Sequence, residues 1–461
     1  MSWLNTLREA VKGSHRQDYT EGPIGRSLVL LAIPMVLETV LESVFAVVDV
    51  FFVARLGADA IATVALTETM EAVVYAVSLG LGIGVTATVA RRIGEKDLEG
   101  AAHAAIQAIA LGVLTAILVA AVGITQAPRL LGLMGGSPAV QQQGAAFTRV
   151  IMGGNIAVLL LFLINAIFRG AGDAAIAMRS LWIANAFNIV LGPCLIFGFG
   201  PFPRLGLVGA AIGTTTGRSI GVLYQLSQLA RRDGRIVIRA EHLGIRWDLM
   251  GRLLRLSGAG IFQMLVGMTS WIGLVRVISG FGSLALAGYL IAIRVVVFAL
   301  LPSWGMSNAA ATMVGQALGA NKPERAETSV WMAARYNAMV QGAIGLLFLA
   351  FAPIIVRLFT RDPAIAPYGV ACLRIVAVGF AFYACGMVVS NAFNGAGDAW
   401  TPTWLNLVFF WLLEIPLAWA LARPLGWGPA GVFTAITVAF SAFAVASMVV
   451  FRRGRWKTRV V

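Results

Sequence analysis

Charged residues are scarce in this chain. They account for 12% of its 461 residues, about half of the roughly 25% that is usual in soluble domains, and 59% of the residues are apolar. Cysteine is scarcer still: the three cysteines lie within apolar runs and form neither a disulfide framework nor a CxxC metal pattern. None of the three histidines begins an HExxH motif, and no constellation of nucleophile, base and metal ligands is visible. These deficits exclude a soluble enzyme and argue against a membrane-embedded one, so we expect no metal centre and no cofactor.

Long apolar runs dominate instead. A helix needs about 20 mostly apolar residues to cross a bilayer. The sequence predicts twelve such spans, at about 28–53, 60–90, 101–125, 144–168, 176–200, 207–230, 253–280, 284–315, 327–356, 368–394, 402–422 and 429–451. The rest of the chain suffices only for short loops. The expected fold class is an all-α polytopic membrane protein with twelve transmembrane helices.

Basic residues are unevenly divided between the two sets of loops. With both termini placed inside, the inner segments hold 23 lysines and arginines and the outer turns hold six. Because cationic side chains resist translocation, this bias predicts an integral protein of the bacterial inner (plasma) membrane with both termini cytoplasmic. It also accounts for much of the net charge of +14 without a nucleic-acid partner.

The sequence repeats itself at an offset of 225 residues. The strongest match aligns the Gly-Ala-Gly-Asp run at 170–173 with the same run at 395–398, and the register slips by about three residues only after the fifth span. Each copy holds six spans, an even number, so we expect two like-oriented six-helix bundles related by pseudo-twofold symmetry. The predicted segments are a cytoplasmic N-terminal segment (1–27), the first bundle (28–230), a basic linker (231–252), the second bundle (253–451) and a basic tail (452–461).

Several motifs follow one another in a recognisable order. They are Pro34 and Asp49 in the first span, the Gly94-Glu95-Lys96-Asp97 loop, the two Gly-Ala-Gly-Asp turns and the Asn185-Ala186-Phe187-Asn188 stretch. Together with the twelve spans and the repeat, they resemble the multidrug and toxic compound extrusion (MATE) transporters from about residue 25 to residue 451. The resemblance implies antiport, in which entry of protons or sodium drives export of hydrophobic or cationic organic compounds.

Carboxylates lie at membrane depth, where a charged side chain costs roughly 2.5–3.5 kcal/mol on the insertion scale. Glu38, Glu42 and Asp49 fall on one face of the first span, and Glu68 and Glu71 lie on neighbouring turns of the second. At the 225-residue offset these five acids correspond to Gln263, Gly267, Leu274, Ile293 and Val296. Since none of those five ionises, we expect ion coupling in the first bundle.

A second interpretation of these acids is that they fix helix packing, with Arg149 or Arg218 as partners. The family resemblance makes Asp49 the leading coupling residue and the place where a sodium ion would bind, and it makes Pro34 a hinge.

Three polar residues of the fifth and sixth spans match positions that line the cation site in family members, namely Asn185, Asn188 and Thr214. Their amide and hydroxyl groups can donate or accept hydrogen bonds there. Gly192 departs from the pattern of some relatives, which have an aspartate at this place.

The second bundle has its own charged residues, Glu414 in the eleventh span and Arg294 in the eighth. A buried salt bridge that positions helices and a contact with substrate or ion are equally open. We add Gln263 and Trp304 as candidate substrate contacts, because an indole ring can stack on organic cations.

A lipid-linked precursor flippase would share the bundle architecture. It would favour a cationic cavity, whereas the acids of the first bundle favour cations. The expected partners are therefore small organic cations or drugs and the lipid bilayer, and we expect a monomer.

Overall fold

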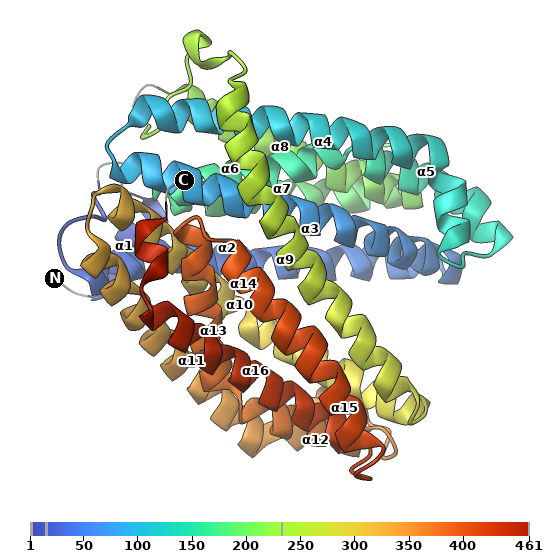
Figure 1. The fold of residues 1–461 in the computed structure, drawn as a ribbon. Coiled ribbons are helices and arrows are strands. Elements are labelled where there is room, and N and C mark those ends of the chain that lie inside the picture. The colour runs from blue at the N-terminus through green and yellow to red at the C-terminus, as the bar shows by residue number, and fades with distance from the viewer. Residues whose placement is uncertain (1–2, 14–16, 232–233, 460–461) are drawn as a thin grey trace.

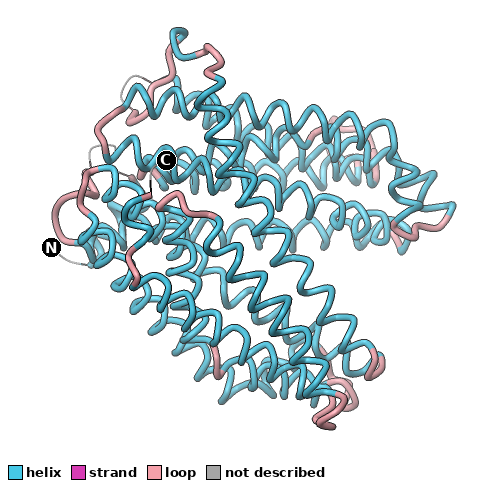
Figure 2. Tube along the Cα trace, viewed as in Figure 1, coloured by secondary structure: helices cyan, strands magenta, loops and turns pink. Residues whose placement is uncertain are grey.

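The computed structural model describes the backbone of residues 3–13, 17–231 and 234–459, and the side chains of the same ranges except at 3–4 and 44–50. Within these ranges the chain forms helices joined by short loops, without any strand (Figure 2). The predicted fold class is confirmed.

The first bundle follows a short helix, α1 (Trp3–Lys12), which packs on α2 and α7. Its helices are α2 (Ile24–Val53), α3 (Ala58–Gly94), α4 (Leu98–Leu133), α5 (Pro138–Gly153), α6 (Asn155–Ala171), α7 (Ala174–Phe197) and α8 (Leu207–Ala230), with the short turn η1 (Ala54–Leu56). The linker contains one further turn, η2 (Ala240–His242).

The second bundle begins with α9 (Trp247–Ser279), α10 (Ser283–Gly319), α11 (Pro323–Phe359), α12 (Ala366–Ala377) and α13 (Phe380–Gly395). It continues with α14 (Trp400–Asn406), the π-helix η3 (Leu407–Glu414), α15 (Ile415–Ala422) and α16 (Pro429–Arg452), and the tail adds the turn η4 (Arg455–Thr458).

Two predicted spans are broken rather than continuous. The span expected at 144–168 is divided into α5 and α6 at Gly154, and the span expected at 368–394 is divided into α12 and α13 near Gly379, with a bend of 58°. Glycine is a poor helix former, which permits a break at each place. Ten helical stretches among the described residues are long and apolar enough to cross a bilayer, and the bent α12–α13 pair would be an eleventh.

The backbone carries the duplication as clearly as the sequence does. Positive φ angles, which are uncommon outside glycine, recur at matched positions of the two copies. The pairs are Gly57 and Gly282 (104° and 97°), Lys96 and Asn321 (62° and 57°), Gly172 and Gly397 (86° and 84°), and, after the slip in register, Gly206 and Gly428 (57° and 59°). The two bundles are therefore structural copies.

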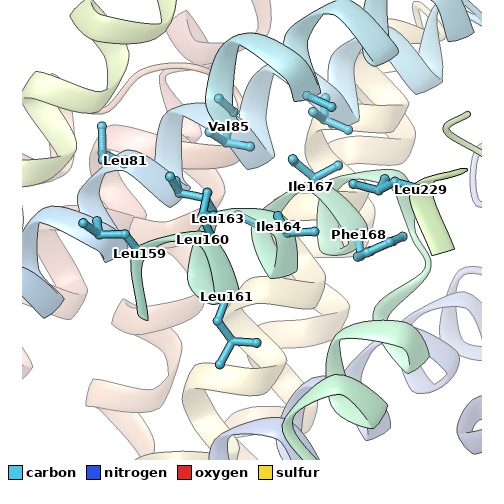
Figure 3. Packing of buried hydrophobic residues seen from close by; sticks show 14 of the residues in the cluster. Leu81, Val85, Leu159, Leu160, Leu161, Leu163, Ile164, Ile167, Phe168 and Leu229 are labelled. Atoms are coloured by element: carbon cyan, nitrogen blue, oxygen red, sulfur yellow. The ribbon is translucent and has the colours of Figure 1, made fainter. Parts of the chain in front are cut away.

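Each bundle buries its own apolar core. In the first bundle, α6 provides more of the core residues than any other helix, and Figure 3 shows Leu160, Leu163 and Ile164 of this helix packed beside Leu81 and Val85 of α3. Helix α6 is apolar nearly all round, as is typical of a helix at the centre of a bundle. Helices α3, α4, α7 and α8 pack around it.

The two bundles meet at the end of the molecule where both termini lie, which we call the terminal end, and their helices diverge away from it (Figure 1). Helix α3 packs on α9 and α10, and α10 packs on α2. Glycines permit the close approach: a methyl group on Gly94 of α3 would overlap the carbonyl of Gln316, and one on Gly319 of α10 would overlap that of Arg91. These two contacts are images of each other at the 225-residue offset.

Candidate functional site

Acids from two helices converge on one arginine of the first bundle. Arg218 of α8 is 7% exposed, its guanidinium lies 3.8 Å from a carboxylate oxygen of Glu71 on α3, and it donates to the hydroxyl of Tyr75. Glu42 of α2 is an electrostatic neighbour of the same guanidinium. An acid of the first span and an acid of the second therefore meet at this cation. Glu68 lies nearby on α3 and is exposed.

A second arginine binds the acid nearest the terminal end. Glu38 of α2 is 5% exposed, and its Oε1 accepts from Arg169 at 2.7 Å and from Asn165 Nδ2 at 3.1 Å, both on α6. The Asn165 carbonyl oxygen in turn accepts from Ser180 of α7 and from Gln225 of α8. Four helices of the first bundle thus share one buried polar network that ends at Glu38, in which Glu38 Oε2 and Gln225 Oε1 have no hydrogen-bond partner.

The polar residues expected to line a cation site also lie together. Asn188 of α7 donates to the hydroxyl of Thr214 on α8 at 3.2 Å, and Asn185 donates to the carbonyl of Leu41 on α2 at 3.1 Å. All three predicted side chains are buried. The side chain of Asp49 lies outside the described residues, so its role stays a prediction.

Arg149 is wrong as a partner of these acids. Its Nε donates instead to the carbonyl of Ile124 at 3.3 Å, near the far end of α4. The repeat-related Arg374 makes the same bond to Leu349 at 3.2 Å. Since both copies keep this bond, it belongs to helix packing, whereas Arg218 is the partner that the acids have.

The four candidates of the second bundle are not brought together. Glu414 is 1% exposed at the end of the π-helix, whereas Arg294 is exposed, and no ion pair joins these two described residues. The salt bridge, one of the two interpretations left open above, is therefore not formed in this structure. Gln263 of α9 is 5% exposed and Trp304 of α10 is 51% exposed, and neither bonds to the other candidates. Their contact with substrate stays a prediction.

Arg169 is the site residue that sequence reasoning missed. It lies one position beyond the predicted end of its span and was therefore assigned to a loop. Side chains near a helix end point back toward the N-terminus of the helix, and a long arginine carries its charge further still. The sequence signal for Arg169 was thus its position directly after a predicted span, in a bundle whose other spans carry acids at membrane depth.

The linker forms one more cluster, in which Glu99, Glu241 and His242 hold donor atoms within 4.8 Å of one another. The ring of His242 accepts at Nδ1 from the backbone N–H of Arg239 at 2.9 Å, so its Nε2 carries the ring proton and donates to Glu99 at 2.5 Å. A metal at Nε2 would displace that proton and leave an imidazolate, and the Arg239 guanidinium already contacts both glutamates. These side chains are therefore better suited to attaching the linker to α4, through the bond between His242 and Glu99, than to binding a metal ion.

The family model described as MatE matches residues 34–194 and 259–420, one match in each bundle. A probable multidrug resistance protein NorM of Thermotoga maritima is 24% identical over 444 residues, which cover 95% of this chain and 94% of that protein. A probable multidrug resistance protein NorM of Caulobacter vibrioides is 27% identical over 483 aligned positions, which cover 100% and 98%.

Solved structures agree on the fold. One described as the outward-facing conformation of a multidrug resistance MATE family transporter of the MOP superfamily superposes with a TM-score of 0.89 at 24% identity, covering 96% of this chain and 98% of its own. The two segments matched by the family model make up well over half of the sequence. The chain therefore belongs to the MATE family of membrane transporters, which are not enzymes.

Proposed function

We propose that this chain is a secondary antiporter that exports hydrophobic or cationic organic compounds in exchange for protons or sodium, with the proton favoured. The observation that carries the proposal is the set of buried acids in the first bundle, gathered around Arg218 and Arg169. Their counterparts in the second copy are all neutral. Acids needed only for packing would be expected in both copies, so the asymmetry supports a role in coupling.

The proposed cycle places the terminal end in the cytoplasm of a bacterial cell, in its inner membrane. The bundles (28–230 and 253–451) rock against each other as a monomer, with the substrate between them, while the segments 1–27, 231–252 and 452–461 stay cytoplasmic. The arrangement in Figure 1, joined at the terminal end and diverging beyond it, suits the outward-open state of this cycle. Pro34 would supply the bend of α2.

Protons are favoured because cations already occupy the space beside the acids. The guanidinium of Arg169 lies 2.7 Å from Glu38, and that of Arg218 lies 3.8 Å from Glu71. A metal cation would have to displace an arginine there, whereas a proton adds no volume. A sodium ion at Asp49, with oxygen atoms of Asn188 and Thr214 as further ligands, is the alternative.

The charge of the site bears on the substrate. Acids outnumber arginines in the first bundle at membrane depth, which favours a cationic cargo and counts against a flippase for pyrophosphate-bearing lipids. In the second bundle, the half-exposed Trp304 is available for stacking on such a cargo.

Transport in proteoliposomes with separately imposed proton and sodium gradients tests the proposal. We expect a proton gradient to drive export of an organic cation such as ethidium, and Asp49→Asn to abolish it without loss of membrane insertion. Export by Asp49→Asn at the wild-type rate would refute the coupling role of this residue. Export driven by the sodium gradient alone would replace the proton with sodium.

Thiol labelling tests the orientation. Cysteines introduced on a cysteine-free background at Gly136 and Asp362 should react with an impermeant reagent from outside, and cysteines at Lys96 and Gly234 should not. The reverse pattern would place the terminal end outside and overturn the proposed cycle.

A further inference from the structure

Four successive backbone carbonyls at the end of α6, residues 169–172, accept hydrogen bonds from outside their own helix. We call this segment the 169–172 turn. The carbonyl of Arg169 accepts from Thr312 Oγ1 (3.1 Å), and that of Gly170 accepts from Gln316 Nε2 (2.9 Å). The carbonyl of Ala171 accepts from the guanidinium of Arg235 (2.6 Å), and that of Gly172 accepts from the hydroxyl of Tyr19 (3.2 Å). The last carbonyls of a helix lack partners within the helix. Here other parts of the chain supply them.

These donors come from three different places. Thr312 and Gln316 belong to α10 of the second bundle, Arg235 belongs to the linker, and Tyr19 belongs to the N-terminal segment. Burial raises the pKa of the Tyr19 hydroxyl to about 12, so this group remains a donor throughout the physiological range. The 169–172 turn is therefore a hydrogen-bonded junction between the first bundle and the rest of the cytoplasmic side.

The first residue of this junction also binds an acid of the coupling cluster. While the carbonyl of Arg169 accepts from Thr312, its guanidinium donates to Glu38 at 2.7 Å. The side chains of Arg169 and Glu38 are 12% and 6% exposed, and the second carboxylate oxygen of Glu38 has no hydrogen bond. A charge-assisted bond of this kind is roughly twice as strong as a neutral one. The charge on Glu38 therefore contributes to the position of the turn.

The second copy has no charged residue at the positions that correspond to Glu38 and Arg169. At the 225-residue offset Glu38 and Arg169 correspond to Gln263 and Asn394, and Thr312 corresponds to Ala87, which has no side-chain donor. Asn394 donates to Asn391 within its own helix. Among the described residues, no side chain of the first bundle donates to the carbonyls of 394–397. The connection between acid and turn thus exists in one copy only.

We propose that Arg169 is a positioning residue that couples protonation of Glu38 to opening of the cytoplasmic side. With Glu38 ionised, Arg169 is held, the turn presents its carbonyls to α10, and the bundles stay closed at the cytoplasmic side. A proton on Glu38 removes the negative charge, so Arg169 loses its ionic partner and the contacts with Thr312 and Gln316 weaken. The cytoplasmic side then opens.

The direction suits an antiporter. Glu42 lies one helical turn beyond Glu38 on α2 and interacts with it electrostatically, so a proton that enters from outside passes Glu42 before it reaches Glu38. Among the described residues, Arg169 and Glu42 are the charged groups that face Glu38. Protonation in the outward-open state would thus trigger the inward-open state, where the proton leaves. This inference rests on the proposed function, because it assigns a task to one of the acids proposed for coupling.

Distance measurements between spin labels test the inference directly. Labels at the exposed positions Leu98 of α4 and Thr328 of α11 report the separation of the two bundles at the cytoplasmic side. The measurement uses the purified full chain in lipid nanodiscs at acidic and at alkaline pH, without substrate. We expect the wild type to lengthen the distance at acidic pH, and Glu38→Gln to show the long distance at both pH values.

The size of the effect follows from the bond that is lost. Hydrogen bonds to charged groups correspond to about a tenfold to a hundredfold change in an equilibrium constant, and we expect a change of that order in the ratio of open to closed populations. Arg169→Gln should open the same side, and Arg169→Lys, which retains the charge, should restore part of the pH response. Asn394→Gln places the same residue at the repeat-related position and should keep the full response.

A second set of variants guards against misfolding. Thr312→Val with Gln316→Leu removes the donors of α10 without touching the ion pair, and it should open the cytoplasmic side at both pH values. A Glu38→Gln protein that stays closed at alkaline pH, like the wild type, would overturn the inference. If that happened while a proton gradient still drove export by the wild type, only the inference would fail. If Glu38→Gln opened as expected but neither gradient drove export by the wild type, the proposed function would fail and the inference about the turn would stand.

Discussion

Arg218→Gln should lower the free energy of unfolding, and a second mutation, Glu71→Gln, should restore most of it. Arg218 and Glu71 have side chains that are 9% and 15% exposed, so they form a buried ion pair. Removing one partner of such a pair costs about 3–5 kcal/mol, because the remaining charge stays in a medium of low dielectric constant. Because Glu71 keeps some access to solvent, we expect the free energy of unfolding to fall by about 3 kcal/mol, at the lower end of this range. This corresponds to about a hundredfold change in the unfolding equilibrium.

The double variant Arg218→Gln with Glu71→Gln should recover most of that loss. Replacing both members of a buried pair is often close to neutral, and here only Glu42 keeps a charge that the guanidinium had balanced. The free energy of unfolding can be followed by tryptophan fluorescence during denaturant titration in mixed micelles. At acidic pH the single and double variants should converge, since protonated acids carry no charge. A double variant as unstable as the single one at alkaline pH would show that Arg218 acts through packing, and would refute the electrostatic account of the cluster.

Three further variants test other contacts. Gly319→Ala adds a methyl group against the Arg91 carbonyl and should push the bundles apart at the terminal end, which would lengthen the distance between the spin labels at Leu98 and Thr328. Tyr19→Phe removes one bond to the 169–172 turn, worth about 1 kcal/mol, and should favour the open state equally at acidic and alkaline pH because the hydroxyl does not titrate there. Glu414→Gln should weaken export of particular cations while the number of protons exchanged per substrate stays the same; a collapsed ratio would move the coupling site to the second bundle.

The arrangement of spans was predictable because it depends on local sequence alone. Hydropathy identifies a helix that must satisfy all its backbone groups within the bilayer, and the offset between Gly57 and Gly282 or between Gly172 and Gly397 survives in the backbone as matched positive φ angles. The breaks at Gly154 and near Gly379 were not predictable from hydropathy, since a broken span is as apolar as a continuous one.

The site was predictable only in part, because local sequence does not show how the helices pack against one another. Periodicity places Glu38 and Glu42 on one face of α2, but it does not show which helix lies opposite. The reach of Arg169 and Arg218 to those acids depends on how α6 and α8 pack against α2 and α3. The sequence left the pairing of Glu414 with Arg294 open, because depth along two spans says nothing about whether the two side chains face each other, and the structure does not form that pair.

The two copies of the repeat share their backbone features but differ in their charges. Backbone features are kept in both copies because the same close packing of α3 on α9 and of α10 on α2 must be satisfied twice. Charges are not bound by that requirement, and they have diverged: the 169–172 turn bonds directly to the other bundle, whereas Asp398 of the second turn contacts Arg459 of the tail, a residue that is 56% exposed. Asp398 is buried, but the Arg459 end of this pair is largely in solvent, so the pair contributes less than a fully buried charge-assisted network. In the proposed mechanism, control of the contact between the bundles at the terminal end therefore falls to the first bundle, the same bundle that holds the acids.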